Sequence, residues 1–556
     1  MALLSLLERL YLQPSSLAKR VLYLLLLIVT LFYFYGLGRM PLVGPDEPRY
    51  AQVAREMLVQ RDLITPTLGG HPWFEKPVLL YWLTIPSYKI FGVTEFAARL
   101  APALSGVLTI LAVFWLARRV ENASHDRELE GFALWSALVA GTTLGLIAFS
   151  RAVTFDILVT LTTTWATAFF FAAESEARQR TRTLFLIGFY VFIGLSLLAK
   201  GLVGLLPVGI AGLFVILRRK VTPKDVFLSL FWGLPLALAV AAIWFGPVTA
   251  RNGKIFLQEF IVQHHFARFL SNKYHHPQPF LFYFVVLVPM TLPWTPFFLS
   301  SVAGVRTWQW KSDISLQRMR VLAFVWTMLP VIAFSFSASK LPGYILPVLP
   351  GVALLAGERL TRFVSNGTSG KAAMRAVGLL AILFAAGGLF YARQSRTLSM
   401  TCALAIVLPL VAAGAIASIW VHFRKTAAAS VVASVVLALV ITLNCGVDKV
   451  AQRDSVAELI QIADARGYSS LRVGTLHTID HTAHFYAYGR LIYGDDSEPK
   501  KYEGPGEVLD AARQNKGALL VLVPLEFLDQ LTSLKSANVD VIANNGTMAI
   551  VAVRLK

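Results

Sequence analysis

The chain has 556 residues, of which 56% are hydrophobic and only 15% are charged. Soluble domains carry about 25% charged residues, so this composition excludes an ordinary soluble protein, a disordered chain and a coiled coil. The net charge of +19 would suit a nucleic-acid-binding protein. However, the basic residues lie between apolar stretches, which is the pattern that the positive-inside rule gives a membrane protein.

Apolar runs of about 18 residues or more recur along most of the chain, and this length crosses the ~30 Å hydrocarbon core of a bilayer. About thirteen runs predict membrane-spanning helices: residues 20–37, 98–117, 130–149, 157–173, 184–199, 201–217, 227–249, 280–300, 320–337, 342–357, 374–391, 400–420 and 427–445. The sequence therefore predicts a polytopic α-helical membrane domain over residues 1–445.

Basic residues between the predicted spans indicate how the chain crosses the membrane. They gather in alternate connections, at residues 19–20, 118–127, 178–182, 218–220, 306–320, 359–375 and 424–425. Lys and Arg are enriched in cytoplasmic loops, so the N-terminus is predicted to be cytoplasmic. The long loops 38–97 and 250–279 then lie outside the cytoplasm, and an odd number of spans places the C-terminus there too.

Residues 446–556 change character after the last predicted span. Helical periodicity is found at Ser455–Arg466 and Gly506–Gln514, and an apolar run at Ala518–Val523 follows the second of these segments. Strand-like patterns are found at Leu471–Thr475, Val539–Ala543 and Met548–Val553. This pattern predicts a small soluble α/β domain outside the membrane.

The first outer loop begins with the polar sequence Asp46-Glu47-Pro48-Arg49-Tyr50 and continues as an amphipathic stretch to Leu58. One apolar face of this stretch has helical spacing: Tyr50, Val53, Ala54 and Met57. A helix of this kind is typical of the membrane interface. The sequence therefore predicts interfacial helices in this loop.

Further polar residues fall on the same side of the membrane. They are Glu75, Lys76 and Tyr81 in the first loop, Asp156 at the mouth of a span, Lys200 at a break between spans, His264, His265 and Arg268 in the second loop, and Lys340 and Tyr344 in a later turn. Ionisable residues at membrane depth are costly and usually functional. Because separate segments bring them to one face, we expect a single polar cavity at the outer membrane boundary.

The residue types indicate the chemistry of the expected ligand. Lysine and arginine neutralise phosphate, and arginine can bind it through two parallel hydrogen bonds. Carboxylates such as Asp46, Glu47 and Asp156 can act as a base, bind a metal ion, or bind an amine or sugar hydroxyls. Both kinds of group beside a bilayer fit the transfer of a phosphate-linked sugar from a lipid carrier.

Six motifs, in order over residues ~40–350, resemble the GT-C polyprenyl-phosphate-dependent glycosyltransferases. They are Asp46-Glu47-x-Arg49-Tyr50-Ala51, Glu75-Lys76-Pro77, the Asp156 loop, His265-x-x-Arg268-Phe269, Pro293-Trp294 and Ser339-Lys340-Leu341-Pro342-x-Tyr344. Within this class they are most similar to the lipid A aminoarabinose transferases, which are related to protein O-mannosyltransferases. Any one motif is weak, but six in register are specific.

The resemblance implies transfer of 4-amino-4-deoxy-L-arabinose from undecaprenyl phosphate to lipid A phosphates. The reaction would take place at the periplasmic face of a bacterial inner membrane and confer resistance to cationic peptides such as polymyxin. The partners implied are the lipid-linked donor, lipid A and membrane lipids, with no nucleic acid, and the chain is expected to be a monomer.

The resemblance also implies roles for individual residues. Asp46 and Asp156 match the family's acidic pair near the reacting centre, and Glu47 is a third catalytic candidate. Candidates for binding the donor phosphate and sugar are Lys76, Arg268, Tyr344, Tyr81, Lys340, Lys200 and Arg49.

A divalent metal ion is a further possibility. Glu75 together with His265 or His264 can coordinate such an ion, with Zn²⁺ favoured because carboxylate and imidazole suit it. Two protein ligands are fewer than a closed structural zinc site has, so phosphate or water would complete the coordination. The alternative is that none of these residues binds a metal ion.

Alternatives remain at several points. A phosphate acceptor is already an anion and needs no base, so Asp46 would orient the sugar, bind its amine or stabilise charge at the anomeric carbon. With a hydroxyl acceptor, Asp46 would be the base. A transporter or flippase would show internal repeats, which we do not see. Cys402 and Cys445 are expected to be unpaired because nothing in the sequence fixes their separation, although a disulfide is the alternative.

Overall fold

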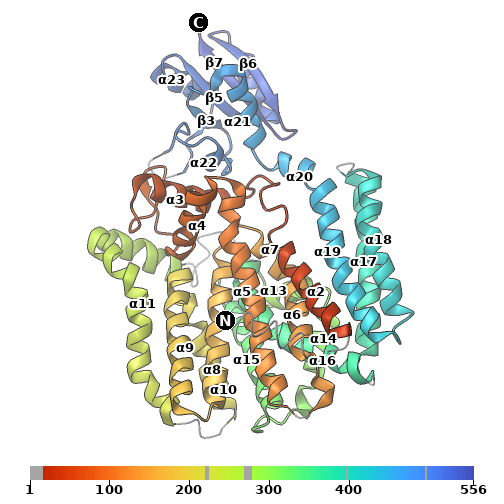
Figure 1. The fold of residues 1–556 in the computed structure, drawn as a ribbon. Coiled ribbons are helices and arrows are strands. Elements are labelled where there is room, and N and C mark those ends of the chain that lie inside the picture. The colour runs from red at the N-terminus through yellow and green to blue at the C-terminus, as the bar shows by residue number, and fades with distance from the viewer. Residues whose placement is uncertain are drawn as a thin grey trace.

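A computed structural model of the chain describes residues 17–124, 126–218, 224–267, 278–367, 369–395, 398–494 and 498–556. For residues 17–18, 261, 264–267, 395 and 448–450 it describes the backbone alone. Long helices form a bundle, and a small sheet domain lies at one end of it (Figure 1). The chain is an integral membrane protein.

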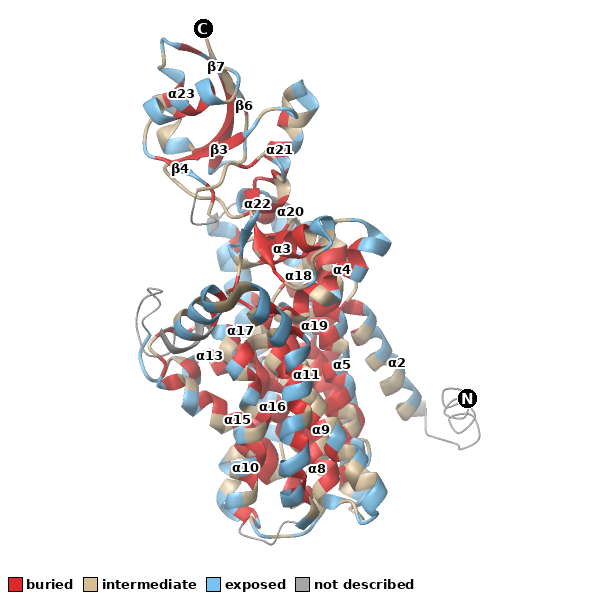
Figure 2. Cartoon of the chain, turned by 90° about the vertical axis from the view of Figure 1, so that its left-hand side faces the viewer, coloured by how far each residue is buried: buried red, intermediate tan, exposed pale blue. Residues whose placement is uncertain are grey.

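The bundle is built from helices of the predicted membrane domain. Their bounds are α2 Leu17–Phe32, α5 Glu95–Asn122, α6 Phe132–Thr142, α7 Leu144–Ser150, α8 Asp156–Ser175, α9 Gln179–Lys200, α10 Leu206–Arg218, α11 Lys224–Phe256, α13 Phe282–Met290, α14 Thr295–Ala303, α15 Ser315–Ser335, α16 Leu349–Asn366, α17 Lys371–Ser395, α18 Met400–Ser418 and α19 Arg424–Cys445. Buried residues concentrate along α5, α8 and α16, whereas α11 exposes much of its surface (Figure 2). Exposed apolar side chains on such peripheral helices suit contact with lipid.

Nine helices of the described residues are long and apolar enough to cross a membrane, or ten if α6 and α7, bent by 60°, form one span. The expected number of thirteen is therefore not confirmed. One reason is that residues 179–218, which contain both α9 and α10, are included among the nine as a single helical stretch. Yet Lys200 contacts Asp156 at the start of α8, and Arg218 contacts Glu174 near its end, so α9 and α10 run in opposite directions. Another is that the predicted span 280–300 is divided into the short helices α13 and α14.

The first outer loop forms helix α3 (Asp46–Gln60), a hairpin of β1 (Thr67–Leu68) and β2 (His71–Pro72), and helix α4 (Leu79–Phe91). The face predicted to be apolar is buried as expected: Tyr50, Val53, Ala54 and Met57. Acidic residues occupy the first turn of α3, where they interact favourably with the helix dipole. This helix therefore lies flat against the bundle and holds its first turn in place.

The C-terminal domain is a five-stranded sheet in the order β4-β3-β5-β7-β6. Its strands are β3 Val473–Leu476, β4 Lys501–Tyr502, β5 Ala518–Pro524, β6 Ala537–Asn544 and β7 Met548–Leu555. Strand β3 pairs in parallel with β4 and β5, whereas β5, β7 and β6 are antiparallel. The helices α21 (Ala457–Ala463) and α23 (Pro505–Gln514) complete the α/β fold that the sequence pattern predicts.

The C-terminal domain contacts the first outer loop through helix α22 (Ala483–Tyr486), which lies between the sheet and α3 (Figure 1). The Tyr486 hydroxyl donates to Glu95 at 2.9 Å and accepts a hydrogen bond from the backbone N–H of Leu42 at 2.7 Å. Arg55 of α3 donates to the carbonyl oxygen of Phe485 at 3.2 Å. The domain is thus joined to the segment that carries the first polar motif.

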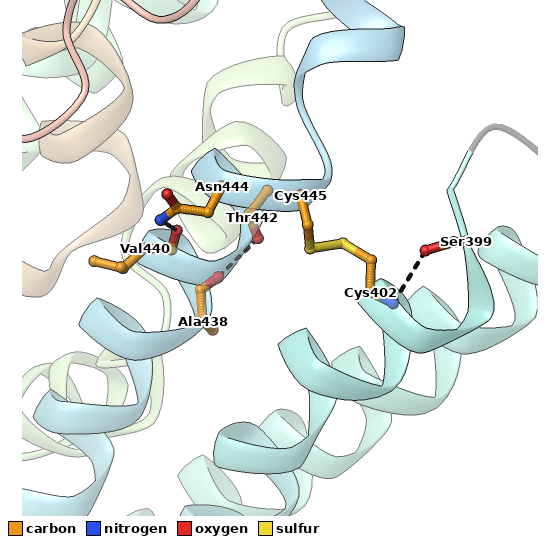
Figure 3. The surroundings of a disulfide bond; sticks show 7 residues. All are labelled: Ser399, Cys402, Ala438, Val440, Thr442, Asn444 and Cys445. Atoms are coloured by element: carbon orange, nitrogen blue, oxygen red, sulfur yellow. Dashed lines mark hydrogen bonds between the residues drawn. A yellow bond between two sulfur atoms is a disulfide. The ribbon is translucent and has the colours of Figure 1, made fainter.

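Cys402 and Cys445 form a disulfide, so the expectation of unpaired thiols is wrong (Figure 3). Cys402 lies in the first turn of α18, and Cys445 is the last residue of α19. These helices form an antiparallel hairpin, which returns the chain to the membrane boundary where it began. The two Cα atoms are 5.9 Å apart, within the range that a disulfide needs.

Candidate active site

A cavity of about 610 Å³ lies where the first outer loop meets the ends of the membrane helices. Its lining has a polar part and an apolar part. The polar part is Asp46, Tyr50, Glu75, Lys76, Thr154, Asp156, Lys200, Ser337 and Tyr344. The apolar part is Pro77, Phe155, Leu202, Val203, Leu205, Leu206, Gly209, Phe260, Leu329, Ala333, Phe334 and Leu341. The charged groups come from loops and helix ends, while much of the apolar surface belongs to α10 and α15.

One charged group of the cavity is the ion pair between Asp156 and Lys200. Asp156 begins helix α8, and Lys200 ends helix α9 before Gly201, whose positive φ of 59° turns the chain away. The Lys200 ammonium also lies 4.7 Å from the centre of the Tyr344 ring, a cation–π contact. Gly343 approaches Asp156 so closely that a Cβ there would lie 2.6 Å from Oδ2. The backbone of this turn therefore closes one side of the acidic group.

A second ion pair joins Glu75 and Lys76 in the loop before α4, where both side chains are nearly buried. The Lys76 ammonium lies 5.8 Å from the centre of the Tyr50 ring. Burial raises the pKa of Tyr50 well above its ordinary value, and the carboxylates of Glu75 and Asp46 raise it further. The Tyr50 hydroxyl is therefore protonated at neutral pH and contributes no charge to the cavity.

Asp46 is the more accessible carboxylate, with 48% of its side chain exposed against 20% for Asp156. Its oxygen Oδ1 accepts a hydrogen bond from Arg49 at 3.1 Å, one turn along α3. Arg49 does not line the cavity. It lies behind Asp46 and also contacts Glu498 of the C-terminal domain at 3.5 Å. Arg49 therefore orients Asp46 from the side that faces that domain.

Glu47, which the sequence analysis gives as a catalytic candidate, lies beside Arg99 and not in the cavity. Its carboxylate binds the Arg99 guanidinium through two hydrogen bonds of 3.0 and 2.8 Å, and both side chains are buried. It also accepts from the backbone N–H groups of Val43 and Val153. Glu47 is outside the cavity lining, so this geometry supports a structural role in joining α3, α5 and the loop before α8.

Two further candidates lie near the cavity but not in its lining. The Lys340 ammonium donates to the backbone carbonyl oxygens of Ser337 at 2.7 Å and Gln278 at 2.9 Å, so it holds a turn together. Tyr81 is fully buried against Phe155, at 5.3 Å between ring centres. Its hydroxyl makes no hydrogen bond to any part of the chain that the structure describes.

Three predicted site residues cannot be placed. Arg268 lies outside the described residues, and the side chains of His264 and His265 lie outside the described side chains. The predicted metal site of these histidines with Glu75 therefore stays a prediction.

A different group could hold a metal ion. Among the residues with described side chains, His481, His484 and Glu498 bring one ligand atom each within 4.8 Å of the others. Burial, together with the nearby Arg49, lowers the pKa of His481 to about 4, so its ring is neutral at pH 7. The sequence analysis missed this group, although the spacing His481-x-x-His484 is a signal that could have indicated it.

Carboxylates and lysines that form ion pairs with one another can exchange these partners for the charged groups of a ligand. A lysine released from its carboxylate partner can bind a phosphate, and the carboxylate is then available for a cation or for hydroxyl groups. The apolar part of the lining can hold an acyl or polyprenyl chain. The cavity can therefore accept an amphiphile with an anionic head.

Comparisons with known proteins show which chains and which fold this protein resembles. A family model described as "Dolichyl-phosphate-mannose-protein mannosyltransferase" matches residues 19–249. An "undecaprenyl phosphate-alpha-4-amino-4-deoxy-L-arabinose arabinosyl transferase" of Pseudomonas aeruginosa is 31% identical over 424 residues, which are 74% of each chain. The enzyme of the same name from Aeromonas salmonicida is 31% identical over 61% of this chain, and the match spans only 60% of that enzyme's length.

A solved structure shares the fold. ArnT from Cupriavidus metallidurans bound to undecaprenyl phosphate superposes with a TM-score of 0.75 at 21% identity, over 97% of this chain and 98% of that one. At this identity the similarity shows a common fold. The sequence similarity to the P. aeruginosa protein goes further, and from it we conclude that the chain belongs to the family of undecaprenyl phosphate-alpha-4-amino-4-deoxy-L-arabinose arabinosyl transferases.

Proposed function

We propose that this protein transfers 4-amino-4-deoxy-L-arabinose from undecaprenyl phosphate to a phosphate group of lipid A. The bond between the anomeric carbon and the donor phosphate would break, and an oxygen of the acceptor phosphate would form the new bond. The proposal combines family membership with a cavity whose lining matches such a donor.

The observation that carries the proposal is the division of the cavity lining. Asp46, Glu75, Lys76, Asp156 and Lys200 supply its charges, whereas helices α10 and α15 supply part of its apolar surface. A polyprenyl phosphate has the same division, with a charged head and a long apolar chain. Binding therefore places the sugar, which lies beyond the phosphate, among the carboxylates.

The charged residues have distinct roles in this proposal. Lys76 and Lys200 stabilise the undecaprenyl phosphate as it leaves, because positive groups placed where charge develops lower the barrier. Asp46 faces the sugar and binds its ammonium group or stabilises the positive charge at the anomeric carbon. No base is needed, because the acceptor phosphate is already an anion.

We further propose that the cavity opens on the periplasmic side of the inner membrane and that the C-terminal domain lies there. The distribution of Lys and Arg between the spans supports this orientation. Reporter fusions at about residue 300 and about residue 450 should report the cytoplasm and the periplasm respectively. The opposite result would overturn the orientation and the proposed side of the reaction.

A hydroxyl acceptor is the second candidate, and the match to the mannosyltransferase family model over residues 19–249 favours it. In that case a proton must leave the acceptor, and Asp46 would act as the general base. The acceptor therefore distinguishes the two candidates and decides the role of Asp46, and it can be determined directly.

The test is mass spectrometry of lipid A from cells that make the donor lipid but lack their own transferase. Cells with this protein should gain the mass of one aminopentose on lipid A, and cells with Asp46→Asn should not. Asp510→Asn, an exposed change on α23, is the matched control and should behave as wild type. Unmodified lipid A in the presence of folded protein would refute the lipid A proposal and favour the hydroxyl acceptor.

A further inference from the structure

A cluster of two histidines and one glutamate lies where the C-terminal domain meets the first outer loop. His484 belongs to helix α22, His481 precedes that helix, and Glu498 comes from the segment before β4. His481 Nδ1 lies 3.4 Å from Glu498 Oε2, and His484 Nε2 lies 3.7 Å from the same oxygen. The two imidazole rings are parallel, with centres 5.8 Å apart. Three potential ligand atoms therefore face a common point.

These separations are close to those of a tetrahedral zinc site. Zinc binds histidine nitrogen and carboxylate oxygen at about 2.0–2.2 Å, so neighbouring ligand atoms of a tetrahedral site lie about 3.3–3.6 Å apart. The distances to Glu498 Oε2 match this spacing or exceed it slightly, whereas they are long for hydrogen bonds. Small side-chain movements would suffice to form the coordination.

The ring of His484 gives an independent reason to expect a ligand. Its side chain is completely buried, and its Nε2 lies 3.7 Å from Glu498 Oε2, which is long for a hydrogen bond, with no closer partner among the described residues. A buried polar atom without a partner costs free energy, so native structures rarely leave one. A metal ion bound at Nε2 would remove this cost.

Outer hydrogen bonds already hold two of the three ligands. His484 Nδ1 lies 3.1 Å from the Tyr493 hydroxyl. When Nδ1–H donates to this hydroxyl, Nε2 carries the lone pair that a metal ion needs. Glu498 uses its other oxygen, Oε1, to contact Arg49 at 3.5 Å. Metal-binding histidines and carboxylates usually have such partners, which fix their orientation.

We propose that His481, His484 and Glu498 bind a Zn²⁺ ion, with water in the fourth position. His481 leaves that position accessible, because 28% of its side chain is exposed. The site lies outside the cavity lining and goes beyond the proposed transferase function, on which it does not depend.

The site would act on the cavity by positioning. Glu498 links the metal to Arg49, and Arg49 in turn binds Asp46 in the cavity. A bound Zn²⁺ would fix Glu498 and so hold Arg49 and the first turn of α3 against the C-terminal domain. His481, His484 and Glu498 are therefore positioning residues, not catalytic ones.

The test measures zinc on the purified full chain, without donor lipid and without a histidine tag. Protein stripped with EDTA is incubated with ZnSO₄, freed of excess metal by gel filtration and analysed for zinc per chain. Wild type should hold one more equivalent than His481→Asn and His484→Gln. His477→Asn is the matched control, because His477 lies in the same domain and pairs with Gln530 outside the cluster.

Two further measurements keep the result interpretable. Tyr493→Phe removes only the outer partner of His484, and loss of such a partner should weaken zinc binding about 10–100-fold in competition with a chromophoric chelator. Zn²⁺ should also raise the thermal midpoint of wild type and His477→Asn but not of His481→Asn, each compared with its own metal-free form. Equal zinc content in wild type and both cluster variants, or none in any of them, would overturn the proposal. Neither result depends on whether lipid A is the acceptor.

Discussion

Asp46 and Glu47 are neighbours in one motif, and replacing each should have opposite consequences. Glu47→Gln should destabilise the protein but leave most of the activity of each folded molecule, because Glu47 binds Arg99 away from the cavity. Asp46→Asn should abolish transfer with little effect on stability, because Asp46 is half-exposed and faces the cavity.

The magnitude for Glu47→Gln follows from the Arg99 site. All five N–H groups of Arg99 donate hydrogen bonds. Two of them bind Glu47, and the other three bind the backbone carbonyl oxygens of Leu37, Met40 and Pro41 at 2.7–2.9 Å. Removing one partner of a buried ion pair costs about 3–5 kcal/mol, because the remaining charge stays buried. For a chain of this length that loss lowers Tm by roughly 3–4 °C.

Asp46→Asn removes a partly exposed contact with Arg49, and such contacts contribute about 1 kcal/mol or less. Its Tm should therefore stay within about 1 °C of wild type.

The assay has two parts, performed on the same preparations. Thermal unfolding in detergent is followed at one fixed scan rate, because membrane proteins often unfold irreversibly. Transfer is measured in proteoliposomes that contain the aminoarabinose donor and lipid A, and the rate is divided by the amount of monodisperse protein. A Glu47→Gln protein with wild-type Tm but no transfer would refute the structural role and restore Glu47 as a catalytic candidate.

Two other changes test the environment of the cavity and the helix hairpin. Gly343→Ala places a Cβ 2.6 Å from Asp156 Oδ2, so it should displace that carboxylate and reduce transfer strongly. Gly212→Ala on α10 is the control, because a Cβ there meets nothing within 4 Å and should leave transfer unchanged. Equal activity of both variants in the proteoliposome assay would contradict the role of Asp156. Cys402→Ser should lower Tm, because the disulfide with Cys445 closes a loop of 43 residues, which the chain-entropy model values at about 4 kcal/mol at most. An unchanged Tm would mean that α18 and α19 are held together by packing alone.

The sequence was sufficient for the outline of the fold because the determining signals are local. Apolar runs locate the helices, and the alternation of helix and strand patterns after residue 445 indicates the C-terminal fold. Breaks within apolar runs are harder to predict. The run 130–149 bends by 60° between α6 and α7, a feature that hydropathy does not reveal.

Contacts between segments that are far apart in the sequence could not be predicted, because local signals do not show which segments meet. Cys402 and Cys445 are separated by 43 residues, and only the antiparallel packing of α18 and α19 brings their Cα atoms to 5.9 Å. His481-x-x-His484 becomes a potential metal site only because Glu498 returns from another segment. Sequence spacing shows ligands that are close together in the chain but not the distant residue that completes the set.

The contrast between Asp46 and Glu47 shows why a motif cannot assign roles to single residues. Successive residues of an α-helix point about 100° apart, so two acidic neighbours at the start of α3 must face different surroundings. One faces the cavity, while the other meets Arg99 of α5 and the backbone N–H of Val153, three residues before Asp156. Glu47 therefore ties the helix that carries Asp46 to the loop that carries Asp156. On this view the motif supplies one carboxylate to the cavity lining and a second one that stabilises the fold beside it, which is why Glu47→Gln should lower Tm more than the activity of each folded molecule.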